Sequence, residues 1–150
     1  MKGVYALVIS IPDGIDMRIG ALGAQRFEAG EWVYIGSAFG NSSTSLEHRI
    51  GRHFSSEKKI HWHIDIFLDV VGPPADVIWS EARKKRECEI AAELKSHAQF
   101  SLGPPGFGSS DCKEKCGTHL FRHHGKNTWK AIEKVFRSLE LEPRSMEDLS

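Results

Sequence analysis

The apolar run over residues 4–11 constrains the fold more than any other segment of this sequence. Only Ser10 interrupts its hydrophobic character, so both faces of an extended strand there would be apolar. A strand that is apolar on both faces belongs inside a sheet, with other elements covering both sides. Residues 4–11 therefore predict a central strand, and the length of 150 residues predicts one domain with its own core.

Further strands and helices follow from periodicity and turn residues. Apolar segments bounded by glycine or proline predict strands over residues 16–19, 25–27, 31–37 and 75–79. Amphipathic spacing, with a capping box at Thr44 and Glu47, predicts helices over residues 44–54, 83–98 and 127–139. Residues 61–71 fit either a strand or a helix, and residues 101–117, rich in Gly, Ser and Pro, predict an irregular connection.

The C-terminal part, residues 125–150, is predicted to be a helical extension that ends in a frayed polar tail from residue 140. No segment has the length of a membrane span, and the start lacks the cleavage pattern of a signal peptide. We therefore expect a cytoplasmic protein that does not cross a membrane. Three cysteines, an odd number, argue against a disulfide framework, and we expect no disulfide to be needed for folding.

The only two tyrosines each stand in a mirrored tripeptide with glycine, Gly-Val-Tyr ending at Tyr5 and Tyr-Ile-Gly beginning at Tyr34. Antiparallel pairing of the two strands that carry them would bring both phenols to one face. A glycine within a strand often marks the close approach of a ligand or another backbone. The alternative is a pair of core tyrosines, each with one hydrogen-bonded hydroxyl.

Two predicted helices each place a charged side chain at or beside their apolar stripe. Arg49 and His53 lie one turn apart in the helix over residues 44–54, where a guanidinium could bind a phosphate bidentately. Glu87 falls at the centre of the apolar face of the helix over residues 83–98, and a carboxylate is seldom buried unless it is paired or bound to metal. The alternatives are an arginine at the rim of the core and a glutamate that stabilises a helix start.

Six sequence blocks together resemble the GIY-YIG nuclease superfamily, in a branch found alone or joined to an endonuclease III-like DNA glycosylase. The blocks begin at Gly3, Tyr34, Arg49, Trp62, Glu87 and Phe107. The resemblance implies a small α+β fold with a central, mainly antiparallel sheet flanked by helices, here followed by a C-terminal helix. It also places Tyr5, Tyr34, Arg49 and Glu87 at the catalytic positions. The stretch between the tyrosines is longer than usual in that superfamily and could hold an extra hairpin.

This resemblance predicts an endonuclease that uses Mg²⁺ or Mn²⁺ to hydrolyse branched or damaged DNA in repair or processing. Glu87 would hold the metal ion, and Arg49 would clamp the scissile phosphate. Tyr5 or Tyr34 would orient or deprotonate the attacking water, with help from the metal, Arg49 or His53. The alternative is a non-catalytic nucleic-acid-binding module of the same fold.

Basic side chains form two local clusters, although the net charge is zero with 20 basic and 20 acidic residues. This balance does not favour nucleic-acid binding through bulk charge, but both clusters flank the predicted site and suit a phosphate backbone. They consist of Arg52, Lys58, Lys59, His61 and His63, and of Arg83, Lys84, Lys85 and Arg86. The ordinary alternative is a solvated surface, and nothing in the pattern indicates the oligomeric state.

A third interpretation, a zinc-stabilised interaction domain, rests on closely spaced metal-binding residues. The possible zinc ligands are Cys112, Cys116, His119 and His123. Earlier in the chain, His61, His63 and Asp65 could act as proton shuttles or metal ligands, or could organise a turn. Cys88 is expected to be a small buried side chain.

Overall fold

The computed structural model of the protein describes residues 1–41, 44–56, 59–109 and 116–149. Its strands are β1 (Gly3–Ile11), β2 (Ile15–Arg18), β3 (Ala24–Phe27), β4 (Gly30–Ala38), β5 (Asp76–Glu81), β6 (Phe100–Leu102) and β7 (Leu120–His123). Its helices are α1 (Leu46–Phe54), α2 (His63–Val71), α3 (Glu87–Ser96) and α4 (Thr128–Ser138), with 3₁₀ turns η1 (Gly20–Leu22) and η2 (Met146–Leu149). None of the helices in the described ranges is long and apolar enough to cross a membrane.

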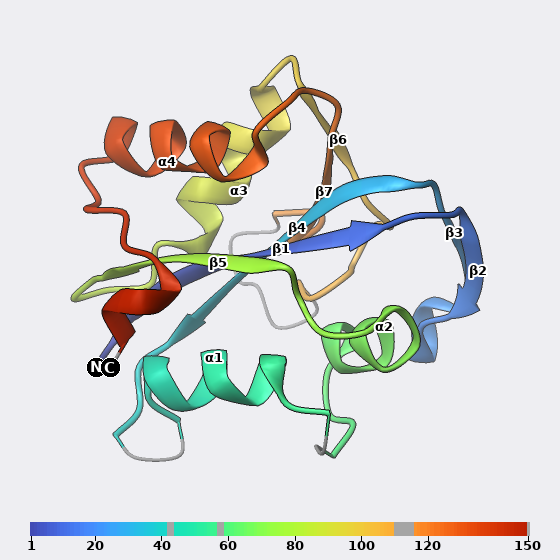
Figure 1. The fold of residues 1–150 in the computed structure, drawn as a ribbon, viewed down its shortest axis with the longest axis horizontal. Helices are drawn as coiled ribbons and strands as arrows, with labels where there is room; N and C mark the ends of the chain where they lie inside the picture. Colours follow the sequence, from blue (N-terminus) through green and yellow to red (C-terminus); the bar gives the residue numbers. More distant parts are fainter. Residues whose placement is uncertain (42–43, 57–58, 110–115, 150) are drawn as a thin grey trace.

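Five strands form one antiparallel sheet in the order β5–β1–β4–β7–β6. β1 pairs with β4 on one side and with β5 on the other, which confirms the central strand predicted over residues 4–11. β2 and β3 form a separate two-stranded sheet, and this hairpin accounts for the long stretch between the two tyrosines. The sheet and its flanking helices confirm the predicted α+β class (Figure 1).

Two helices cover each face of the five-stranded sheet (Figure 1). Side chains alternate along β1, so Tyr5 and Leu7 join the core on the α1 and α2 face, whereas Val4 and Ala6 join the core on the α3 and α4 face. The two hydrophobic clusters share no buried residue, so the sheet separates two core layers. Any site that combines residues from α1 and α3 must therefore lie at an edge or end of a strand.

Two helices begin later than predicted. The N-cap of α1 is Ser45, whose hydroxyl accepts a hydrogen bond from the His48 backbone N–H at 3.3 Å, so the capping box predicted at Thr44 is wrong. Helix α3 begins at Glu87, and residues 83–86 lie in the connection that precedes it. Four consecutive cations would oppose the positive end of a helix dipole, whereas a glutamate in the first turn stabilises it. The ambiguous segment over residues 61–71 forms helix α2.

Strands β6 and β7 lie where the sequence analysis predicted no strand. β7 pairs with β4, and β6 pairs with β7, so the two strands extend the sheet on the side away from β5. They contain only three and four residues, which is too short for an alternating pattern to be recognised.

The C-terminal segment lies along β5 instead of fraying as predicted. Trp79 and Arg144 exchange two backbone hydrogen bonds, of 3.0 and 2.8 Å, in an isolated antiparallel bridge. The Trp79 indole N–H also donates to the Ser145 carbonyl at 2.7 Å, and Leu141 is buried in the α3 and α4 core layer. The segment thereby covers part of a sheet edge that would otherwise be open.

Candidate active site

Strand β4 continues beyond the end of β7, and a cavity lies along this stretch of its edge. β7 pairs with β4 only over residues 31–34, followed by a single hydrogen bond of 2.9 Å from the Ile35 N–H to the His119 carbonyl. The cavity has a volume of about 420 Å³. Its walls include the four residues that the resemblance places at the catalytic positions, Tyr5, Tyr34, Arg49 and Glu87. They line one concave surface, while their catalytic roles stay predictions.

Two glycines make room for the two phenol rings. Tyr5 and Gly36 are direct cross-strand partners, and a Cβ atom at position 36 would lie 2.5 Å from the Tyr5 ring. Gly108 does the same for Tyr34, because a Cβ atom there would lie 2.8 Å from that ring. Gly108 also has a φ of +68°, which residues with a side chain rarely adopt. Both tyrosine rings thus pack directly against backbone. Gly36 of the second tripeptide is needed because any side chain there would clash with the ring of Tyr5.

Both phenols are buried and remain protonated at neutral pH. Burial raises the pKa of Tyr5 well above its usual value, and the neighbouring Tyr34 adds to this effect. Burial likewise raises the pKa of Tyr34. The Tyr5 hydroxyl lies 2.7 Å from Nε2 of His53, which is also buried. The two tyrosines therefore present hydroxyl groups to the cavity, and His53 is placed to exchange a proton with Tyr5.

Arg49 reaches the cavity from α1 and is held in place on two sides. Its Nη1 donates to the Ser37 carbonyl at 2.7 Å, and the guanidinium carbon lies 5.1 Å from the centre of the Trp62 ring. A guanidinium carries five N–H donors, so anchoring one of them leaves the group able to bind an anion in the cavity.

Glu87 reaches the same cavity from a helix on the opposite face of the sheet. It is the first residue of α3, whose buried Ile90 and Leu94 pack in the core layer on the far side from Tyr5. Helix α3 starts near the part of β4 that has no strand neighbour on the β7 side, and the carboxylate lies at the cavity wall there. Its buried oxygen Oε2 has no hydrogen-bond partner among the residues that the structure describes.

This unsatisfied oxygen fits a metal ligand. A buried carboxylate oxygen without a partner is costly, and in a polar cavity it commonly marks the place of an ion or a water molecule. Carboxylate oxygen is a donor that Mg²⁺ and Mn²⁺ prefer. The geometry of Glu87 is therefore compatible with the metal site predicted from the sequence.

The buried carboxylate of Asp65 organises the turn into α2. It forms a bidentate ion pair with Arg52, with both N···O distances 2.9 Å, and accepts the backbone N–H groups of His61 and Trp62 at 2.9 Å each. Burial alone would raise the Asp65 pKa, but Arg52 and the two backbone donors outweigh it and hold the pKa below its usual value. Of the two roles open to Asp65 from the sequence, the structure favours the turn, and this turn sets the position of Trp62 at the cavity.

Part of the predicted nucleic-acid-binding set surrounds the cavity. His61, His63 and Lys85 line it, and Lys59, Arg83 and Lys84 are exposed to solvent. Lys58 lies outside the described residues.

Two predicted nucleic-acid-binding arginines are instead engaged within the protein. Arg52 is held by Asp65 and donates a further hydrogen bond of 2.6 Å to the Lys59 carbonyl. Arg86 pairs with Glu89 and donates to the Leu139 carbonyl at 2.8 Å, which ties the start of α3 to the end of α4. The sequence could not show that each cation has a carboxylate partner within the fold, and a nucleic-acid contact by either arginine stays a prediction.

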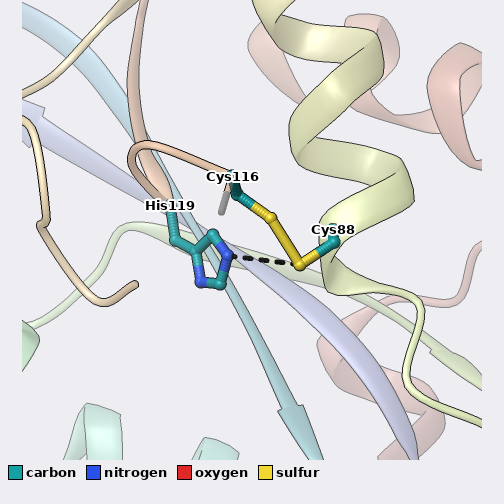
Figure 2. A group of neighbouring side chains, drawn as sticks. All are labelled: Cys88, Cys116 and His119. Atoms are coloured by element: carbon teal, nitrogen blue, oxygen red, sulfur yellow. Dashed lines mark hydrogen bonds between the residues drawn. A yellow bond between two sulfur atoms is a disulfide. The ribbon is translucent and has the colours of Figure 1, made fainter. Parts of the chain in front are cut away.

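Cys116 and His119 meet Cys88 at the first turn of α3 (Figure 2). Cys88 and Cys116 are joined as a disulfide with their Cα atoms 5.9 Å apart, and the Cys88 Sγ lies 3.9 Å from Nε2 of His119. The odd number of cysteines did not indicate this pairing. The expectation that Cys88 is a small buried side chain is also wrong, because it is only half-buried and is bonded to Cys116, 28 positions away.

His123 does not belong to this group, although its spacing suggested a zinc ligand. Its Nδ1 lies 2.7 Å from the Thr128 hydroxyl, and its ring stacks on Phe100. Burial lowers the pKa of His123, and burial likewise lowers the pKa of His119. Cys112, the remaining predicted zinc ligand, lies outside the described residues.

The chain belongs to the family described as "Domain of unknown function DUF123", whose model matches residues 4–141. Comparisons with curated proteins and with solved structures gave no match. The family match spans the whole five-stranded sheet, the cavity and helix α4.

Proposed function

We propose that this member of the DUF123 family is a metal-dependent endonuclease that hydrolyses phosphodiester bonds in DNA. One observation carries the proposal. Two buried phenols, a guanidinium and a carboxylate with an unsatisfied buried oxygen line a single cavity of about 420 Å³. The resemblance of the sequence blocks to the GIY-YIG nuclease superfamily supports it, because those blocks supply all four of these side chains.

Each of these groups has a distinct part in the proposed reaction. Glu87 would hold Mg²⁺ or Mn²⁺, and this ion when bound would stabilise the negative charge on the phosphate and the leaving oxygen. Arg49, fixed by Ser37, binds the non-bridging oxygens of the scissile phosphate. The phosphate would thus be bound from two directions, by Arg49 on α1 and by the metal ion at Glu87 on α3, which lie on either side of the β4 edge.

The tyrosines orient the attacking water and do not act alone as bases. Their raised pKa values keep both phenols protonated, so a phenolate would have to form at a large energetic cost. Tyr5 can avoid that cost by passing its proton to Nε2 of His53, 2.7 Å away, as it takes a proton from the water. We assign His53 to this relay and Tyr34 to positioning the water or the phosphate.

The surroundings of the cavity suit a nucleic-acid backbone. His61, His63 and Lys85 lie at its wall, and Arg83 and Lys84 are exposed in the connection before α3. These side chains can contact phosphates on either side of the scissile one. A cytoplasmic role in processing branched or damaged DNA is part of the proposal.

The decisive experiment compares wild type with Glu87→Gln in cleavage of plasmid and branched DNA, with Mg²⁺ or Mn²⁺ added. The substitution keeps the shape of the side chain and removes its charge, so cleavage should fall about a hundredfold or more. DNA affinity should be unchanged or slightly higher. The melting temperature without metal should hold or rise, since the substitution removes the negative charge from a buried oxygen that has no hydrogen-bond partner among the described residues.

Glu93→Gln is the matched control, because Glu93 lies on the same helix and is exposed. It should cleave like wild type. Full cleavage by Glu87→Gln would remove that residue from the mechanism. DNA binding by wild type with no cleavage under any of these metals would support a non-catalytic binding module of the same fold.

A further inference from the structure

Three side chains that could bind a metal, and that the proposed hydrolysis does not use, meet at the cavity, which His119 helps to line. Cys88 stands on the first turn of α3, and Cys116 and His119 lie just before β7 (Figure 2). One ligand atom from each, two sulfurs and one imidazole nitrogen, lie within 4.8 Å of one another. Figure 2 shows all three side chains pointing toward one another, so no change of backbone is needed to bring them together.

We propose that Cys88, Cys116 and His119, with both cysteines reduced, bind one zinc ion. Thiolate and imidazole donors bind zinc in preference to Mg²⁺, so this site is distinct from the oxygen-donor site at Glu87. Two such ligands on a tetrahedral zinc ion lie roughly 3.5 Å apart, given metal–ligand distances of about 2.3 and 2.0 Å. The separation of 3.9 Å between the Cys88 Sγ and Nε2 of His119 is close to that value. The fourth position is left to water or a further ligand.

The backbone holds His119 in the orientation that such a site requires. Its N–H donates to the Phe107 carbonyl at 2.9 Å, and its carbonyl accepts the Ile35 N–H at 2.9 Å. These two backbone hydrogen bonds fix the segment that carries the imidazole, whose Nε2 faces Cys88.

The disulfide and the zinc site are alternative states of the same two sulfurs. Reduction by a phosphine adds two electrons and two protons to the Cys88–Cys116 bond and gives two thiols, while the phosphine takes the oxygen of a water molecule. Zinc binding then replaces the two thiol protons, which are released to solvent. In either state α3 is tied to the start of β7, so Glu87, next to Cys88, keeps its place at the cavity.

The experiment measures zinc on the reduced, folded protein. Wild type is reduced with a phosphine, equilibrated with Zn²⁺, desalted and analysed for metal, and its melting is followed with and without Zn²⁺. We expect one zinc per chain and a rise in melting temperature of roughly 5 to 10 °C at a zinc concentration about a hundredfold above the dissociation constant. A chelator should reverse this rise.

Variants identify the ligands. Cys88→Ser, Cys116→Ser and His119→Gln should each weaken zinc binding roughly a hundredfold or more, because each loses a direct ligand. His123→Gln should retain zinc, which separates this site from the set that spacing alone suggests. Circular dichroism checks that each variant is folded. If a variant does not fold, the effect of Zn²⁺ on the melting of wild type still tests the proposal.

Failure to retain zinc in reduced, folded wild type would overturn the proposal, as would full zinc retention in the folded cysteine variants. The outcome does not depend on cleavage. Glu87→Gln should keep its zinc while it loses cleavage, so the zinc site and the proposed catalytic metal site are tested independently.

Discussion

The ring of Tyr5 occupies the space where a side chain at position 36 would stand. Gly36→Ala should therefore push the ring aside or open the β1–β4 pairing, because the new Cβ atom would lie 2.5 Å from the ring. Overpacking of this kind costs about 1 to 3 kcal/mol, so we expect the free energy of unfolding in denaturant to fall by that amount. Cleavage should fall as well, since the contact between Tyr5 and His53 depends on the position of the ring.

Gly51→Ala is the control for this prediction. Gly51 is exposed in α1, and a Cβ atom there would have no neighbour within 4 Å. Alanine in place of a helical glycine should raise stability by about 0.5 to 1 kcal/mol and leave cleavage unchanged. A Gly36→Ala variant as stable and active as wild type would show that the tyrosine does not need this space.

Single residues could be predicted from the sequence where their chemistry conflicts with their surroundings. A glutamate on an apolar helix face and two tyrosines beside strand glycines can be recognised in this way. The resemblance to the GIY-YIG superfamily predicts that they form one site. The partners of Asp65 and Cys88 could not be predicted in this way. Arg52 lies 13 residues from Asp65, and Cys116 lies 28 from Cys88, so only the folded chain brings each pair together.

At the scale of elements, the entry into α2 depends on one buried ion pair. Asp65→Asn keeps the shape of the side chain but leaves the Arg52 guanidinium without its charged partner. We expect a loss of roughly 2 to 4 kcal/mol in the free energy of unfolding, because removing one member of a buried pair leaves the other uncompensated. The turn that holds Trp62 against the cavity should loosen, which tryptophan fluorescence and cleavage assays would detect.

The same pair makes a prediction for pH. The folded state lowers the Asp65 pKa, so the stability this group contributes is present above its unfolded pKa of about 3.9 and is lost as pH falls through the lower folded value. The difference in stability between wild type and Asp65→Asn should therefore narrow below about pH 4. Asp69→Asn, at an exposed position of the same helix, should change stability by less than about 0.5 kcal/mol. A constant difference across this pH range would contradict the assignment.

Elements could be predicted where the apolar pattern is long, and less well where it is short. The eight-residue run gave the central strand, and helix α4 was predicted within one residue at each end. Strands β6 and β7 were missed because three or four residues carry too little pattern, yet β7 defines where the edge of β4 becomes uncovered. The start of α3 was predicted four residues early because the basic run continued the helical spacing.

On the scale of the whole molecule, the site forms where the two core layers meet at one sheet edge. Arg49 belongs to a helix on one face and Glu87 to a helix on the other, and only the shortness of β7 lets both reach the same cavity. Sequence reasoning predicted that these side chains converge through the family resemblance. It could not supply the reason, because strand order is set by long-range pairing that no local pattern records.

The C-terminal segment closes the opposite edge of the sheet, and its removal gives the last prediction. Deleting residues 142–150 keeps Leu141 in the core but removes the Arg144 bridge and the hydrogen bond from the Trp79 indole to Ser145. Three lost hydrogen bonds, worth about 1 kcal/mol each, are partly offset by the chain entropy regained, so stability should fall by about 1 to 3 kcal/mol. The melting temperature should drop by roughly 2 to 4 °C per kcal/mol, and the fluorescence of the newly exposed Trp79 should shift to longer wavelength.

The truncated protein should also self-associate at high concentration, because an open strand edge pairs with other chains. Arg144→Ala keeps the backbone bridge and should behave nearly as wild type, losing the contact of the guanidinium with the Trp79 ring and an exposed ion pair with Glu142. Cleavage should survive the deletion, since none of residues 142–149, the described part of this segment, lines the cavity. A truncated protein that has the melting temperature of wild type and stays monomeric would show that the edge of β5 does not need to be covered by the C-terminal segment.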